Sequence, residues 1–393
     1  MIENGYTFDY ISDKQVRGTR LDNGVLKTEG DAAYETILLP AVKFMEISTL
    51  QHVMQLAEEG ATILVMESMP GDVPGFHDFE MRKQKLTDLL EKFSLLPSDV
   101  TPVGKGRIII GDDMEGLMNQ AGIIREPMVD KGLKFIRRGN PEYITYFVSN
   151  QTARSIDEWI GVGTLGRSDI LMDPMTGQSG LAHSRKKNGN QEVYLQLEPG
   201  ETRILRIFPG KKVKGDYFPV SGPAMDELLV SGTWNVEFTE GGPSLPSALT
   251  TDTLMSWTRL GDKEALRFAG AARYSIDIEL TDLKSERWML DLGDVRESAR
   301  VSVNSRPVGV LVAHPYRIDI TDFLQAGENS IAIEVTNLSA NRIRDLDIRE
   351  VDWKKFYDIN FVTQNYQPFD ASIWDLKPSG LLGPVKLLPY KKF

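Results

Sequence analysis

The segment Trp288–Asn341 constrains the fold more than any other part of this chain. It contains four short runs, VSV, VGVL, YRIDI and SIAIEV, that cluster or alternate apolar and β-branched residues. Turn residues (Asn-Ser and Gly-Glu-Asn) separate these runs. Patterns of this kind are typical of short β-strands joined by tight turns. The segment therefore predicts a β-rich domain in the last third of the chain.

The length of 393 residues predicts more than one domain, because a domain of this kind uses about 150 residues. The residue pattern changes twice along the chain, and it divides the sequence into an α/β domain (1–125), a small antiparallel β-domain (126–220) and a β-sandwich (221–393). A Lys- and Gly-rich stretch, 211–222, reads as the linker before the sandwich.

The first region alternates strand and helix patterns. We expect strands at Tyr34–Pro40, Ala61–Met66 and Lys105–Gly111, and helices after Ser48, at Phe79–Phe93 and at Asp113–Gly122. Strand–helix–strand order with short connections indicates a parallel sheet covered by helices. We therefore expect a three-layer, flavodoxin-like arrangement.

The second and third regions lose the helical period. Strands are expected at Leu133–Arg138, Glu142–Asn150, Asp157–Gly163, Ser168–Asp173, Glu192–Leu197, Thr202–Phe208, Gly232–Phe238 and Phe268–Leu280. Gly, Asn and Pro turns lie between them, which favours antiparallel pairing.

Composition excludes several partners and cofactors. The net charge is −11 and no long basic run is present, which argues against nucleic acid and anionic membranes. The chain has no Cys, and its four His residues are far apart in sequence. Thiolate and His-pair metal sites are therefore not expected, and neither is a cofactor. No stretch approaches the ~18 apolar residues that span a membrane.

Phrases spread along the chain resemble one enzyme family. They include GYTFDYISD (Gly5–Asp13), FVSNQ (Phe147–Gln151), LEPGET (Leu197–Thr202), LDLGDV (Leu290–Val295) and SGLLGPV (Ser379–Val385). Their ordered set resembles the C-terminal, non-barrel portion of glycoside hydrolase family 106, the α-L-rhamnosidases. The segment Trp288–Asn341 also resembles the sugar-binding, galactose-binding-like jelly-roll sandwich of family 2 enzymes.

This resemblance implies an accessory role. In family 106 the catalytic carboxylates and a calcium site belong to a (β/α)8 barrel that precedes the matching segments. No residue here corresponds to them, so the resemblance implies no catalytic residue and no metal ligand. It implies an N-terminal catalytic barrel and carbohydrate as partners. It also implies that the chain is a fragment of a longer periplasmic or extracellular protein.

The chain offers one tempting pair of carboxylates. Glycoside hydrolysis uses two carboxylates that flank the scissile bond, and Asp291 and Asp294 lie close together in LDLGDV. Asp residues at strand ends more often cap turns, and we expect that role for both.

Aromatic residues gather in one irregular run, Leu338–Pro378. A pyranose stacks its C–H face on an aromatic ring while polar groups bind its hydroxyls. The candidate sugar contacts are Trp353, Tyr357, Tyr366, Trp374, Arg342 and Asp345. The alternative is that this run only packs against the catalytic barrel.

Two further functions stay open from the sequence. The chain could be a free-standing carbohydrate-binding or scaffold protein without hydrolytic activity. It could also join a ligand-sensing α/β module to a lectin-like sandwich, in which case a small molecule should bind near the Pro/Gly-rich loop Met66–Gly75.

Overall fold

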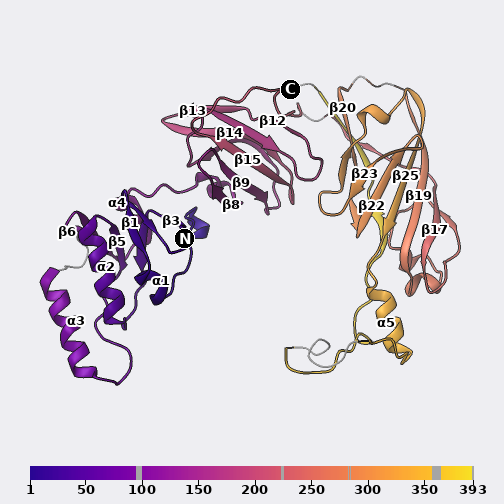
Figure 1. Ribbon diagram of the computed structural model, residues 1–393. Coiled ribbons are helices and arrows are strands. Elements are labelled where there is room, and N and C mark those ends of the chain that lie inside the picture. Colours follow the sequence, from indigo (N-terminus) through magenta and orange to yellow (C-terminus); the bar gives the residue numbers. More distant parts are fainter. Residues whose placement is uncertain (94–99, 223–224, 282, 284, 356–363, 392–393) are drawn as a thin grey trace.

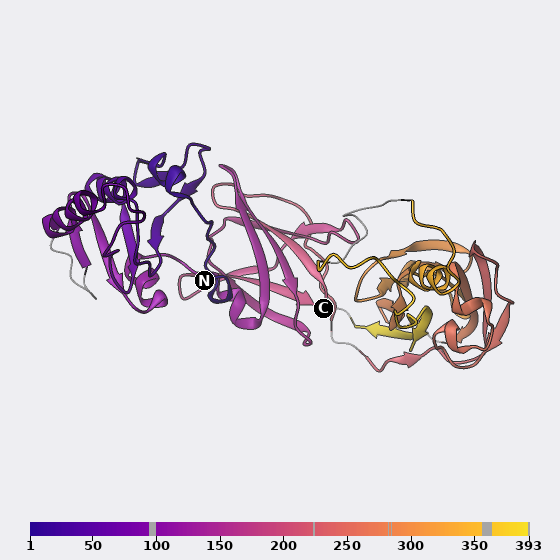
Figure 2. The ribbon, with the colours of Figure 1, turned by 90° about the horizontal axis from the view of Figure 1, so that it is seen from below.

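The computed structural model describes residues 1–93, 100–222, 225–281, 283, 285–355 and 364–391. Three bodies follow one another along an extended molecule, from the indigo α/β part through the magenta middle part to the orange and yellow sandwich (Figures 1 and 2). The buried apolar residues form separate cores within residues 6–118, 128–218 and 230–387. No helix among the described residues is long and apolar enough to cross a membrane.

The first body has one mixed sheet with helices on both faces. Its elements are η1 (Ile2–Asn4), α1 (Asp13–Arg17), β1 (Arg20–Asp22), β2 (Val25–Lys27), β3 (Ala33–Tyr34), β4 (Thr36–Leu39), α2 (Ile47–Glu59), β5 (Thr62–Met66), α3 (Phe79–Phe93), β6 (Val100–Val103), β7 (Gly106–Gly111) and α4 (Met114–Ala121). The strand order is β4-β5-β7-β6, with β4, β5 and β7 parallel and β6 antiparallel.

Alternating side chains on β5 serve both faces of this sheet. Ile63 and Val65 pack with α2 and α3, whereas Leu64 packs with α4. This alternation follows from the period of two in a strand, and it gives the three layers that the sequence pattern predicts. Asp113 caps α4, as its side chain accepts from the backbone amides of Glu115 and Gly116.

The parallel strand expected at Tyr34–Pro40 is present as β4, but it is shorter than expected. β3 ends at Tyr34 and β4 begins at Thr36. β3 joins a separate small sheet, β1-β2-β3, that the sequence pattern does not indicate. These three strands have only two or three residues each, which is too short for an alternating pattern to stand out.

The middle body is built from two antiparallel sheets. Its elements are η2 (Pro127–Lys131), β8 (Leu133–Gly139), β9 (Ile144–Asn150), β10 (Ile156–Val162), β11 (Ser168–Met172), β12 (Ser179–Leu181), β13 (Ser184–Lys187), β14 (Asn190–Leu197) and β15 (Thr202–Phe208). The sheet β12-β11-β15-β9-β8 and the sheet β10-β14-β13 share one core. All six strands expected here are present, and β12 and β13 are additional.

The last body also has two sheets around one core. Its elements are β16 (Leu228–Leu229), β17 (Trp234–Gly242), β18 (Leu249–Thr251), η3 (Trp257–Arg259), η4 (Glu264–Leu266), β19 (Ala269–Leu280), β20 (Arg287–Asp291), β21 (Asp294–Arg296), β22 (Ser298–Val303), β23 (Arg306–Leu311), β24 (Arg317–Asp319), η5 (Thr321–Phe323), β25 (Gly327–Thr336), α5 (Ala340–Ile348), β26 (Gly380–Gly383) and β27 (Lys386–Tyr390). The sheet β18-β17-β19-β25-β22-β23 faces β16-β27-β20-β24, and β21 pairs with β26. The four runs VSV, VGVL, YRIDI and SIAIEV lie in or at β22, β23, β24 and β25.

The expectation of an irregular run from Leu338 was wrong at its start. The helix α5 occupies Ala340–Ile348. Four of its nine residues are charged, and only Asn341 is buried as a whole residue, so the sequence shows no apolar stripe of helical period. Local ion pairs support it instead, since Asp345 pairs with Arg342 at 2.9 Å and with Arg349 at 2.7 Å.

A buried carboxylate joins the first two bodies. Glu126 is 1% exposed, and it accepts from Arg137 Nη1 (2.8 Å), the Tyr146 hydroxyl (2.8 Å) and the amide of Gly163 (2.7 Å). Its own amide donates to the carbonyl of Gly5 at 2.9 Å. Gly5 has φ 87°, and a Cβ there would lie 2.5 Å from the Glu126 carbonyl oxygen. The N-terminal segment is therefore fixed against the middle body by close backbone contact.

Glu126→Ala should destabilise the protein by ~3 kcal/mol, because it leaves Arg137 and Tyr146 without their buried partner. Glu158→Ala is the matched control. Glu158 pairs with Lys131, but both side chains are more than 40% exposed, and its loss should cost less than about 1 kcal/mol. Urea unfolding of both variants gives the comparison. Equal midpoints for Glu126→Ala and the parent would contradict this role.

Limited trypsin digestion should first cut the chain in the stretch 211–215. Lys211, Lys212 and Lys214 are exposed and lie outside the strands, and exposed irregular segments are the preferred sites of nicking. Mass spectrometry should show fragments that meet in this stretch. Changing the three lysines to Gln should protect the chain, whereas a first cut inside 133–208 would contradict the expected linker.

Candidate functional site

The candidate sugar contacts lie on an arm beside the terminal sandwich. We call residues 338–355 and 364–378 the α5 arm. It extends from the end of the sandwich opposite the C-terminus (Figure 1). Asn341 anchors it, since its side chain donates to the Lys377 carbonyl and accepts from the Lys377 amide, both at 2.8 Å. Arg344 Nε adds a bond of 2.6 Å to the carbonyl of Trp374.

One buried carboxylate organises the arm. The side chain of Asp347 is 7% exposed. It accepts from Trp353 Nε1 at 2.6 Å and from the Ala371 amide at 2.8 Å, and Lys354 Nζ lies 3.3 Å away. Burial opposes the ionised form, but the hydrogen bonds from Ala371, Trp353 and Lys354 hold the pKa of Asp347 below its usual value. Asp347 therefore connects α5 to both parts of the arm that carry aromatic residues, through Trp353 and through the backbone of Ala371.

Three aromatic rings pack edge to face on this support. Phe369 lies between the two tryptophans, with ring centroids 6.0 Å from Trp353 and 5.6 Å from Trp374. Lys354 Nζ sits 5.5 Å from the Phe369 ring centroid. Both tryptophans are half-buried, so each ring contributes to packing and keeps part of its surface open. Open ring surface of this kind can stack on a pyranose.

The other candidates divide into distinct roles. Arg342 and Asp345 pair with each other along α5, so their charges serve the helix. Tyr366 is 75% exposed and has φ 56°, and it is the most open ring among the described candidates. Tyr357 lies outside the described residues. The structure therefore brings Trp353 and Trp374 together through Phe369.

The sequence alone does not identify the two residues that hold this cluster together. Asp347 and Phe369 lie within the aromatic run, but a single sequence gives no sign that one Asp among the chain's 56 acidic residues is buried. The position of Phe369 between the two tryptophans depends on the fold of the arm.

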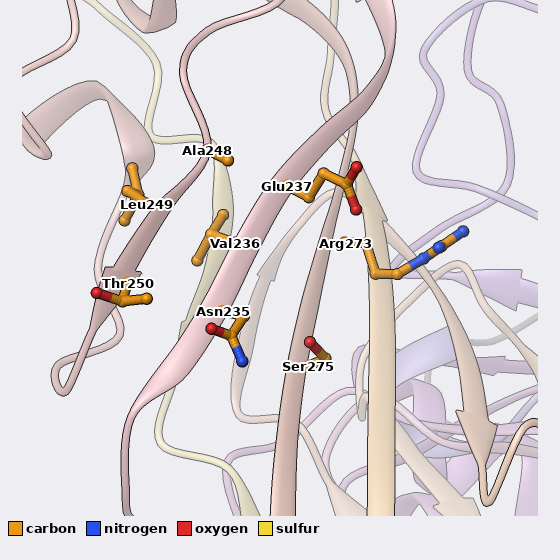
Figure 3. Close-up of a pocket in the computed structure, with 8 residues that line it drawn as sticks. All are labelled: Asn235, Val236, Glu237, Ala248, Leu249, Thr250, Arg273 and Ser275. Atoms are coloured by element: carbon orange, nitrogen blue, oxygen red, sulfur yellow. The ribbon is translucent and has the colours of Figure 1, made fainter.

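A shallow hollow lies on the outer face of the six-stranded sheet (Figure 3). Its volume is about 480 Å³. Asn235 and Glu237 from β17, Thr250 from β18, and Arg273 and Ser275 from β19 line it. These side chains suit hydroxyl groups, but the described lining includes no aromatic ring that could support a pyranose face. The α5 arm is therefore the stronger candidate for a sugar contact.

Asp291 has the turn role expected of it, whereas Asp294 forms an ion pair instead. Asp291 accepts from the amide of Gly293 at 2.9 Å and from Arg317 Nε at 2.7 Å. Asp294 pairs with Arg296 at 2.7 Å. Both carboxylates are thus held by a turn or an ion pair, and the arrangement gives no free acid and base. Within the described part of the chain, no cluster of His, Asp and Glu could hold a metal ion.

The loop Met66–Gly75 is tied to the segment before α2. The carbonyl of Lys43 accepts from the amides of Gly71 (3.1 Å) and Asp72 (3.0 Å), and the Asp72 carbonyl accepts from Met45. Its backbone groups are therefore partly used within the domain. The ligand-sensing hypothesis stays a prediction for this loop.

Trp374→Ala should weaken glycan binding by ~1 kcal/mol and lower stability by ~2 kcal/mol. The latter is about half the cost of truncating a fully buried Trp. Trp353→Ala should cost more stability, because it also removes a hydrogen bond to Asp347. Tyr366→Asn is the control for stability, as Asn tolerates the left-handed backbone of this exposed position. Thermal unfolding and glycan titration measure both effects. Unchanged binding in all three variants would make these rings purely structural.

Comparison with known proteins agrees with the resemblance in the sequence. The sequence pattern of the glycoside hydrolase 106 family, described as α-L-rhamnosidase, matches residues 1–184. A protein of Formosa agariphila named as a β-glucuronidase is 31% identical over 254 residues, which cover 57% of this chain and 21% of that protein. The structure of a rhamnosidase from Novosphingobium sp. PP1Y matches 98% of this chain with TM-score 0.73 and 25% identity.

This chain is much shorter than both relatives, since it spans 21% of the Formosa protein and 36% of the Novosphingobium rhamnosidase. The match to the rhamnosidase nevertheless runs through all three bodies, because it covers almost the whole of this chain. The chain is a glycoside hydrolase family 106-like protein.

Proposed function

We propose that this chain is the accessory, non-catalytic region of an α-L-rhamnosidase-like glycoside hydrolase that acts on polysaccharide. The observation that carries the proposal is the fold match, which covers 98% of this chain but 36% of the Novosphingobium rhamnosidase. In this proposal the region supports a catalytic (β/α)8 barrel and contributes contacts to the glycan.

The state of the carboxylates supports a non-catalytic role. A glycosidase needs one carboxylic acid to protonate the leaving group and a second carboxylate as base or nucleophile. Asp291 is held by Arg317 and Asp294 by Arg296. Asp347 is buried and takes hydrogen bonds from three partners. Each of these carboxylates is already held by an ion pair or by hydrogen bonds, which disfavours a role as the acid, base or nucleophile of a glycosidase.

The surface of the α5 arm supports a contact with a neighbouring domain. Ile348, Val351 and Ile373 are apolar and 48%, 41% and 81% exposed. Burial of such side chains against a catalytic barrel would be favourable at about 25 cal/mol per Å² of apolar surface. In this proposal the apolar side of the arm packs on the barrel, while Tyr366 and the open edges of Trp353 and Trp374 face glycan.

The finer description of the three bodies belongs to the same proposal. We assign residues 1–125 to a flavodoxin-like α/β domain, 126–220 to a small β-sandwich and 221–393 to a galactose-binding-like jelly roll. The separate cores at 6–118, 128–218 and 230–387 support these boundaries.

The alternative function is a free-standing carbohydrate-binding or scaffold protein. It predicts glycan binding by this chain without a catalytic partner. The coding sequence upstream of Met1 separates the two proposals, since an in-frame barrel-coding region supports the accessory role.

The purified chain should not hydrolyse an aryl α-L-rhamnoside. The assay compares the parent with a mock preparation and with the variants Asp291→Asn and Asp294→Asn. We expect the same background in all four samples, because neither carboxylate is free to act. Turnover by the parent that exceeds the mock preparation and disappears in one variant would overturn the non-catalytic assignment.

A further inference from the structure

A second candidate site lies where the middle body meets the terminal sandwich. A cleft of about 500 Å³ is lined by His183 and the segment 217–221 on one side, and by Arg287, Asp319 and Asp322 on the other. Figures 1 and 2 show the C-terminal end of the chain beside this junction. Pockets of this size at domain junctions are common ligand sites.

An exposed aromatic ring forms one wall of the cleft. Tyr217 is 63% exposed. It stacks on His183 with ring centroids 4.7 Å apart and planes 20° from parallel. Since His183 covers one face of the ring, much of the exposed surface belongs to the other face and the edge. This leaves a flat apolar surface beside polar groups.

The backbone holds Tyr217 in this position. The Leu181 amide donates to the carbonyl of Asp216, and the Phe218 amide donates to the carbonyl of Leu181, both at 2.8 Å. The next side chain, Phe218, is buried in the core of the middle body. A Cβ at Gly180 would lie 2.4 Å from the Phe218 amide nitrogen, so the strand and this segment are in close contact. The exposure of Tyr217 is therefore built into the fold.

The opposite wall carries an oriented guanidinium group. Arg287 Nε donates to Asp319 Oδ2 at 2.8 Å, and Nη1 donates to Ser221 Oγ at 2.7 Å. Asp319 Oδ1 accepts from the hydroxyl of Thr321 at 2.6 Å. Among the described residues, Nη2 of Arg287 has no hydrogen-bond partner. A group held in this way can donate to a ligand oxygen without losing side-chain freedom on binding.

The charges of the cleft favour an uncharged ligand. Asp319, Asp322 and Glu286 are acidic, whereas Arg287 and Lys391 are basic. Burial opposes ionisation of Asp319, yet the bonds from Thr321 and Arg287 hold its pKa below the usual value. Opposite charges lie close together, so neither an anion nor a cation gains a large net attraction.

We propose that this cleft binds a neutral saccharide, with one sugar ring stacked on Tyr217 and its hydroxyls bonded to Arg287 and the acidic side chains. An aromatic plate beside charged hydrogen-bonding groups matches the two kinds of surface on a pyranose. The site needs no catalytic domain, so it goes beyond the accessory function and does not rest on it.

The test is a titration of the intact chain with methyl α-L-rhamnopyranoside, methyl α-D-glucopyranoside and D-galacturonate, followed by saturation-transfer NMR. The parent should bind at least one neutral glycoside, and bind galacturonate more weakly. Tyr217→Ala should weaken the neutral ligand about tenfold, because it removes the stacking surface. Tyr217→Phe keeps the ring and should stay within about twofold of the parent.

Control variants separate this cleft from the α5 arm. Glu158→Ala removes an exposed ion pair outside both sites and should leave monosaccharide binding unchanged, whereas Trp374→Ala reports any binding by the arm. If Tyr217→Ala melts well below the parent, Gln178→Ala is a second test of the proposed site, because it changes an exposed polar residue that lines the cleft. Binding lost in Trp374→Ala and kept in Tyr217→Ala and Gln178→Ala would overturn the proposal, as would a parent that binds none of the neutral glycosides or prefers galacturonate.

Discussion

The arrangement of this molecule depends on a few ionic contacts between neighbouring bodies, each of which has its own small core. We call these contacts joints. Glu126 is the most buried of them. It receives hydrogen bonds from Arg137, Tyr146 and the Gly163 amide while its backbone binds Gly5. A charged carboxylate is costly to bury alone, and these donors offset that cost. Burial and the nearby Glu126 charge raise the pKa of Tyr146 above its ordinary value, so this hydroxyl stays a donor at neutral pH.

A second joint fixes the middle body to the sandwich by surface contacts. Arg317 bridges Asp291 of the sandwich at 2.7 Å and Glu198 of the middle body at 3.2 Å. Arg287 and Ser221 add one hydrogen bond across the same boundary. Pairs that are partly exposed contribute little stability, so this joint should yield more easily than the one at Glu126. The proposed saccharide cleft lies at the same boundary.

The sequence predicts the parts of this fold that follow from local periodicity. Alternation identifies β19 and β25, and Asp113 with Gly122 marks both ends of α4, because strand period and helix caps are properties of neighbouring residues. The helix α5 escapes such reasoning, since ion pairs and the Asn341 anchor stabilise it in place of an apolar stripe. The β1-β2-β3 sheet escapes because its strands are too short.

The candidate functional residues likewise include some that the sequence indicates and others that only the tertiary structure reveals. A cluster of aromatic residues in the sequence draws attention to Trp353 and Trp374, but their contacts with Asp347 and Phe369 depend on the tertiary fold. The sequence gives no signal for Tyr217, because it stands alone in the linker stretch. It stacks on His183 only when the middle body folds, and it shares a cleft with Arg287 only where two bodies meet. A single sequence gives little indication of sites at domain junctions, because their residues come from distant segments.

The two candidate contacts are also independent in energetic terms. The α5 arm is held by Asn341, Lys377 and Asp347, all within the last body, whereas the cleft depends on the joint between the second and third bodies. Mutational effects usually add when sites are distant and share no partner. A region built in this way can lose one contact and keep the other.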